Sequence, residues 1–242
     1  MLKELLAAFV IVSAMATVAF ADPPEVRSMT DPQMGDHWTY TQRDEATGEE
    51  KGTYTQTVTE VQGEDVSVRI TMAGKSKGLV TYDRQWNMKD NLTWRFSPHD
   101  GFGIKTPLAV GATWTVEVGQ TTIIDGKGGA WKGSRTVRVV GQGPVTTRAG
   151  QFDAFEIENS FRNEGGMSPK KEQDSSAKTE QDSSEKKDLA VSGKLEQEGV
   201  LRMWYAPAIN HWVKRVTEIR LDGGPTAKST EELVEYGRRK EN

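Results

Sequence analysis

Apolar side chains at every second position recur in short runs along this chain, and glycines separate the runs. The clearest run lies in residues 65–72, where Val66, Val68, Ile70 and Met72 alternate with polar residues. A period of two places all four side chains on one face of an extended strand. The chain also contains 24 glycines, a frequency typical of many turns. The pattern predicts short antiparallel strands that are each exposed on one face.

Further runs of the same kind predict strands along most of the chain, and no sustained helical period occurs before residue 188. Besides a strand that contains Trp38 and Tyr40 and the run described above, strands are expected at residues 52–61, 78–82, 86–88, 92–96, 113–118, 131–140, 152–161, 189–205, 211–221 and 229–236. Many short strands with glycine between them favour an all-β protein, built as a curled antiparallel sheet or barrel.

The first 21 residues predict a secretory signal peptide. A positive start at Lys3 is followed by an apolar stretch over residues 5–21, which ends in the small-x-small sequence Ala19-Phe20-Ala21. Signal peptidase cleaves after such a sequence. An uncleaved anchor is the alternative, but the stretch barely reaches the roughly 20 apolar residues that span a membrane. We therefore expect cleavage near Ala21 and a periplasmic or secreted protein.

The remaining chain divides into a leader, a domain and an insert. Residues 22–34 contain three prolines and predict an extended leader, and residues 35–242 are long enough for one β domain. Residues 163–188 interrupt the strand pattern with two copies of Glu-Gln-Asp-Ser-Ser among many lysines. Since this segment is too polar to bury a core face, we expect a disordered loop there.

Composition excludes several classes of protein. The chain has no cysteine, so it forms no disulfide and cannot carry the diacyl anchor of a lipoprotein, which is attached to a cysteine. We therefore expect no stable membrane anchor after signal cleavage. The net charge of −4 does not support a nucleic-acid partner.

Residues for catalysis or metal binding are scattered. His37, His99 and His211 lie at least 62 positions apart, which gives no local metal-ligand spacing, and surface or strand-edge positions are expected for His37 and His211. The Gly-x-Ser-x-Gly motif of a serine nucleophile is absent, and the glycines of residues 126–129 lack the P-loop spacing. We expect no catalytic residue, metal or cofactor.

The seven tryptophans are the remaining candidates for a binding surface. Aromatic rings along a concave sheet could bind sugar rings or an acyl chain. Most of the tryptophans alternate with apolar residues on their own strand, which favours a core role. Trp86 and Trp131 face the other way in this interpretation, and they are the candidate ligand-binding residues.

Three segments feed predicted strands from turns: residues 107–114, 148–155 and 204–215. The first contains a Pro-Leu-x-x-Gly-x-x-Trp turn, the second an Ala-Gly-x-Phe-x-Ala turn, and the third a Trp-Tyr-x-Pro stretch that leads to Val-Lys. Within the third, Asn210 suits a residue with positive φ.

In this order the three segments resemble an exported bacterial domain-of-unknown-function family, over roughly residues 35–236. Members often have glycine where this chain has Asn210, and the insert departs from the family pattern. The resemblance implies a single, strongly curved antiparallel sheet, like a half-barrel or β-roll. It implies no catalytic residues.

These features predict an exported, non-enzymatic protein of the cell envelope that binds or scaffolds a partner, either an unknown protein or an apolar small molecule. A first alternative is a carrier that holds a lipid or acyl chain in the concave face of the sheet. A second alternative is a hydrolase with dispersed catalytic residues, which requires His37 or His211 within hydrogen-bond reach of a carboxylate.

Overall fold

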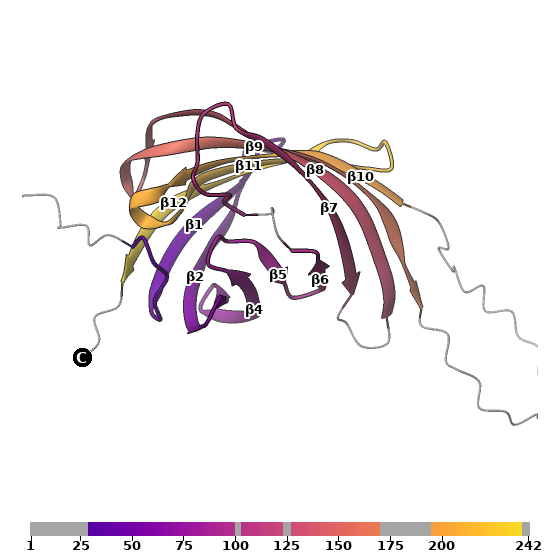
Figure 1. Ribbon diagram of the computed structural model, residues 1–242, viewed down its shortest axis with the longest axis horizontal. Coiled ribbons are helices and arrows are strands. Elements are labelled where there is room, and N and C mark those ends of the chain that lie inside the picture. The colour runs from indigo at the N-terminus through magenta and orange to yellow at the C-terminus, as the bar shows by residue number, and fades with distance from the viewer. Residues whose placement is uncertain (1–28, 100–102, 123–126, 170–194, 239–242) are drawn as a thin grey trace, which may run out of the picture.

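The computed structural model describes residues 29–99, 103–122, 127–169 and 195–238. Within these residues the chain forms a closed barrel in which each strand pairs antiparallel with its neighbour in sequence (Figure 1). The strands are β1 (Asp36–Asp44), β2 (Glu50–Gln62), β3 (Asp65–Met72), β4 (Lys75–Asp83), β5 (Met88–Asp90), β6 (Trp94–Ser97), β7 (Thr113–Thr122), β8 (Lys127–Thr147), β9 (Gly150–Pro169), β10 (Leu195–Ala206), β11 (His211–Leu221) and β12 (Ala227–Arg238). The described residues contain no helix that is long and apolar enough to cross a membrane. The expected signal peptide lies outside them.

The all-β antiparallel prediction is confirmed, but the open half-barrel is wrong because the first strand pairs with the last. The register of β1 with β12 runs from Asp36 opposite Arg238 to Asp44 opposite Ser229. At one end of this seam the Arg238 side chain binds Asp36 through two hydrogen bonds, Nε to Oδ1 at 2.6 Å and Nη2 to Oδ2 at 2.9 Å. Asp36 is fully buried. This bidentate, charge-assisted pair fixes the register at the point where the ring closes.

Most strands lie where the alternation places them. The hairpin of β2 and β3 and the full extent of β11 agree with the sequence prediction. The start of the polar insert differs, because β9 continues to Pro169 and includes residues 163–169. Asn163 pairs with Gly133 on one side and Gln197 on the other, and this pairing of the backbone outweighs the polarity of the segment. Residues 170–188 of the insert lie outside the described residues.

Aromatic side chains fill the end of the barrel where β10 passes into β11. Trp38 stacks on the His211 imidazole with ring centroids 4.1 Å apart and meets Trp86 edge-on at 5.4 Å. The Tyr40 hydroxyl lies 2.5 Å from His211 Nδ1 and donates to the Trp212 carbonyl at 2.8 Å. All five side chains are buried. This cluster of aromatic rings fills one end of the barrel interior and does not extend through the rest of it.

The connection between β10 and β11 ties the leader to this end. A 3-10 turn, η1 (Pro207–Ile209), ends at Asn210, whose φ of 48° and ψ of 41° confirm the left-handed conformation predicted for it. The Asn210 Nδ2 donates to the Thr30 carbonyl at 3.1 Å, and Met29 N donates to the Ala208 carbonyl at 3.1 Å. Met29 is buried. The end of the leader therefore packs against the barrel.

In the barrel interior, a glycine on one strand makes room for a large side chain on the next strand. Gly199 of β10 lies opposite Phe161 of β9. A Cβ at position 199 would lie 2.2 Å from the Glu218 carbonyl oxygen and 2.7 Å from Phe161 Cζ. The absence of a side chain at this position lets the phenyl ring lie against β10.

We predict that Gly199→Ala lowers the free energy of unfolding by about 1–3 kcal/mol, because the new methyl group overlaps backbone as well as the ring. Gly143→Ala is the matched control, since nothing lies within 4 Å of its Cβ position. It should change stability by less than about 0.5 kcal/mol. Urea unfolding followed by circular dichroism measures both, and equal stability of the two variants would contradict the packing described here.

Candidate functional site

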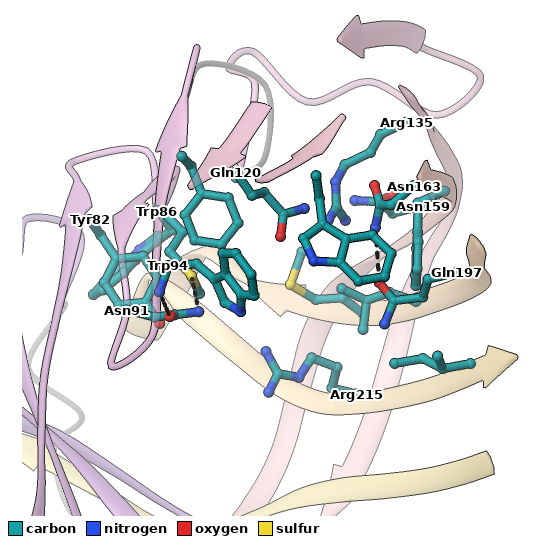
Figure 2. A pocket seen from close by; sticks show the side chains of 18 of the residues that line it. Tyr82, Trp86, Asn91, Trp94, Gln120, Arg135, Asn159, Asn163, Gln197 and Arg215 are labelled. Carbon is teal, nitrogen blue, oxygen red and sulfur yellow. Dashed lines mark hydrogen bonds between the residues drawn. The ribbon is translucent and has the colours of Figure 1, made fainter. Parts of the chain in front are cut away.

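A cavity of about 420 Å³ lies inside the barrel, beyond the aromatic cluster. Its lining residues come from strands β4 to β11 and from the segments that join β4 to β5, β5 to β6 and β6 to β7. In Figure 1 the long strands arch over the short strands β4 to β6. Figure 2 shows Asn159, Asn163 and Gln197 on one side of the cavity and Trp86 and Trp94 on the other. The volume is in the range of small-molecule sites, about 300–1,000 Å³.

Carboxamides form a polar strip on two adjacent strands. Asn159, Phe161 and Asn163 occupy alternate positions of β9, so all three point into the cavity. Gln197 of β10 lies opposite Asn163 and accepts a hydrogen bond from its Nδ2 at 3.0 Å. Gln120 of β7 adds a further carboxamide to the lining. The side chains of Asn159 and Asn163 are almost completely removed from solvent.

Asn159, Asn163 and Trp212 line the cavity, and each has a polar atom that lacks a hydrogen-bond partner in the described structure. Two are acceptors, the Oδ1 atoms of Asn159 and Asn163, and the third is a donor, Nε1 of Trp212. All three residues are at least nine-tenths buried, with exposures of 5%, 2% and 5% in that order. A buried polar atom without a partner costs about 1–3 kcal/mol, so such atoms commonly mark a place where a ligand or water binds.

Two arginines line the same cavity in different electrostatic settings. Burial lowers the pKa of Arg135 to about 10, and its guanidinium lies 5.0 Å from the centroid of the Phe161 ring. Burial also disfavours the charge of Arg215, but the neighbouring Glu231 carboxylate raises its pKa above the usual value. Arg215 Nε donates to Glu231 Oε2 at 2.7 Å. Both arginines therefore stay positively charged at neutral pH, and the charge of Arg215 is neutralised by Glu231.

The opposite wall is aromatic and contains a backbone outlier. Trp94 and Phe96 of β6 line the cavity, together with Trp86 from the turn between β4 and β5. Trp86 has a φ of 61°, a conformation that is costly for a bulky residue and clusters at functional sites. Its indole Nε1 donates to Asn210 Oδ1 at 3.1 Å. Asp83 holds the turn from the other side, since its Oδ1 accepts from the backbone N–H of residues 85 and 87 at 2.8 and 2.9 Å.

Both tryptophans that the sequence singled out, Trp86 and Trp131, lie in the cavity wall. They share it with Trp94 and Trp212, which the alternation assigned to the core. The division into core and binding tryptophans by strand face therefore does not hold. Trp86 is 5% exposed and also packs in the aromatic cluster, whereas Trp131 is half-buried on β8.

The histidines lie in different environments from each other. The expectation of a surface or strand-edge position is wrong for His211, which is fully buried, while half-buried His37 places Nδ1 3.1 Å from the Gly35 carbonyl. Among the described residues neither imidazole forms a hydrogen bond or an ion pair with a carboxylate, which is the contact that the hydrolase alternative requires. The described residues also contain no group of three histidine, cysteine, aspartate or glutamate side chains that could hold a metal ion.

The carboxamides and Arg135 were missed in the sequence, although a signal was present. Asn159, Phe161 and Asn163 continue the phase of buried Ile157 along β9. Polar side chains in the phase of an apolar face indicate buried hydrogen-bonding groups. The sequence alone could not show which way that face points or what lies across from it.

We predict that acid destabilises the protein through His211. Burial, followed by the charge of Arg215, lowers the pKa of this imidazole well below its usual value. The folded state therefore keeps the ring neutral, whereas the unfolded chain binds a proton below about pH 6.5. The free energy of unfolding should fall with decreasing pH below about 6.5, at a slope that approaches 1.4 kcal/mol per pH unit.

Urea unfolding of the wild type, His211→Gln and His37→Gln between about pH 7 and pH 5 measures this slope. The slope should flatten in His211→Gln and stay close to that of the wild type in His37→Gln. An equally steep slope in His211→Gln would show that another group is responsible.

Comparison with known proteins shows similarity in fold to a few solved structures. No protein-family model matches the chain, and no curated protein matches it. A crystal structure of a candidate lipoprotein from Parabacteroides distasonis ATCC 8503 aligns over 87% of this chain and 99% of its own, with a TM-score of 0.50 and 14% identity. A candidate exported protein with YmcC-like fold from Bacteroides fragilis NCTC 9343 aligns over 88% and 100%, with a TM-score of 0.42 and 14% identity. The hypothetical lipoprotein YmcC from Escherichia coli aligns over 82% and 84%, with a TM-score of 0.39 and 8% identity.

At 14% identity the first of these structures shows a shared fold and carries no information about function. Membership of a sequence family stays a prediction.

Proposed function

We propose that this protein is an exported, non-enzymatic binding protein that encloses a small organic molecule inside its barrel. The cavity of about 420 Å³ is the observation that carries this proposal. Apolar side chains dominate its wall and a few polar groups converge on it, which is the usual make-up of a small-molecule site. The predicted signal peptide in residues 1–21 supports a location in the periplasm or outside the cell.

The lining favours small-molecule binding over a purely scaffolding role. A scaffold needs an outer surface, whereas the strained Trp86 turn and the buried carboxamides of Asn159 and Asn163 all face inward. Strain and unpartnered polar groups lower stability, so their concentration around one cavity points to binding there. In this proposal Trp86 and Trp131 contribute apolar contact surface to the ligand.

The carrier of an apolar chain is the second candidate, supported by Met88, Leu201 and Met203 in the lining. A bare acyl chain would cover these residues well. An acyl chain has no hydrogen-bonding group for the carboxamides of the polar strip on β9 and β10. A ligand with both apolar and hydrogen-bonding groups therefore fits the cavity better.

We predict that filling the cavity weakens binding of an apolar fluorescent probe. Leu201 is half-buried in the wall. The Leu201→Trp substitution therefore places a bulkier indole ring in the open volume. Leu79→Trp is the matched control, because Leu79 of β4 is 50% exposed. Titration with N-phenyl-1-naphthylamine, followed by its fluorescence, should show a loss of affinity of roughly tenfold or more for Leu201→Trp alone. Equal probe binding by the wild type and both variants would refute an internal site.

A further inference from the structure

Unpartnered hydrogen-bonding atoms of opposite kinds belong to side chains that line the cavity. The Oδ1 atoms of Asn159 and Asn163 can only accept, and the Nε1 of Trp212 can only donate. A ligand that satisfies all three must both donate and accept hydrogen bonds. Hydroxyl groups do both, and they do so without carrying a charge into a buried site.

Charged ligands match this arrangement less well. A cation could donate to the two amide oxygens, but the guanidinium group of Arg135 lines the same cavity and would repel it. A carboxylate or phosphate would be attracted by Arg135, but it has no donor for the oxygens of Asn159 and Asn163. An uncharged group avoids both conflicts.

The aromatic side chains suit a ring with apolar faces. Trp94, Trp131 and Phe161 line the cavity together with the carboxamides, and Figure 2 shows Trp94 across from Asn163 and Gln197. A ligand between these walls meets the Trp94 ring on one side. On the other side it meets the amide groups, with the rings of Trp131 and Phe161 beside them on β8 and β9. A sugar ring has this character, since its C–H faces are apolar and its hydroxyls project from the edge.

A glycine on the neighbouring strand makes room for one of the carboxamides. Gly133 of β8 pairs with Asn163, and a Cβ at Gly133 would lie 2.0 Å from Asn163 Oδ1 and 2.6 Å from the Arg162 carbonyl oxygen. The amide oxygen thus occupies the space that a side chain at position 133 would fill. Together with the hydrogen bond from Asn163 Nδ2 to Gln197, this contact holds the oxygen in one place.

We propose that the barrel binds a neutral, polyhydroxylated ring, the sugar unit of a free or conjugated glycan, with its hydroxyl edge on Asn159 and Asn163 and a ring face on the tryptophans. This inference rests on the proposed function and names the class of ligand. Each amide oxygen should contribute one hydrogen bond, so losing it weakens sugar binding by roughly 3- to 10-fold.

The test measures binding of three neutral disaccharides, maltose, cellobiose and N,N′-diacetylchitobiose, by isothermal titration calorimetry at millimolar concentrations. The variants are Asn159→Leu and Asn163→Leu, which remove the acceptors at similar volume, and Gly133→Ala, which displaces the Asn163 carboxamide while keeping it. Ser160→Leu is the matched control, because Ser160 lies next to Asn159 on β9 and is exposed on the outer face. N-phenyl-1-naphthylamine serves as the apolar probe for every variant.

We expect at least one disaccharide to bind the wild type and the Ser160→Leu protein equally, and to bind the other three variants more weakly. The apolar probe should bind Asn163→Leu as well as the wild type or better, which shows that the variant is folded and its cavity intact. If no disaccharide binds while the apolar probe does, the glycan inference is overturned and the proposed binding function stands. If neither binds, both are overturned.

Discussion

The pairing of β1 with β12 is the constraint on which the rest of the structure depends. It turns a curved sheet into a ring, so the inner faces of the strands surround a common interior. The ion pair of Asp36 with Arg238 lies at the end of this seam, in a position where Asp36 is fully buried. Once the ring is closed, buried polar groups such as those of Asn159 and Asn163 must find partners inside it.

The interior is divided into a packed end and a hollow one. Trp38, Tyr40 and His211 fill the first with stacked rings, and a connecting segment ties the leader to the same end. Around the cavity, glycines lie opposite large inward side chains of the neighbouring strand. Gly133 lies opposite Asn163, and Gly199 lies opposite Phe161. The shape of the cavity therefore depends as much on missing side chains as on those that line it.

Local features of this fold could be predicted from the sequence, whereas relations between distant segments could not. Alternation located β3 and β11, and the need for a positive φ marked Asn210. The pattern left a curled sheet and a barrel open, and the family resemblance implied a half-barrel. Nothing local in the sequence indicates that residues 36 and 238 pair. The same limit applies to the site. Trp131 was expected on a binding surface, but the amide oxygens of β9 were missed because a polar residue in a strand usually indicates solvent.

The extent of pairing between neighbouring strands varies around the barrel, and the shortest pairing lies beside the cavity. Strand β5 has three residues, and its register with β6 consists of the single pair of Asp90 with Arg95. By contrast, β8 and β9 pair along nearly their whole length. Local opening of a protein follows its least stabilised hydrogen-bonded unit. Breathing motions of this barrel should therefore concentrate at β5 and β6, the strands that bring Met88 and Trp94 to the cavity wall.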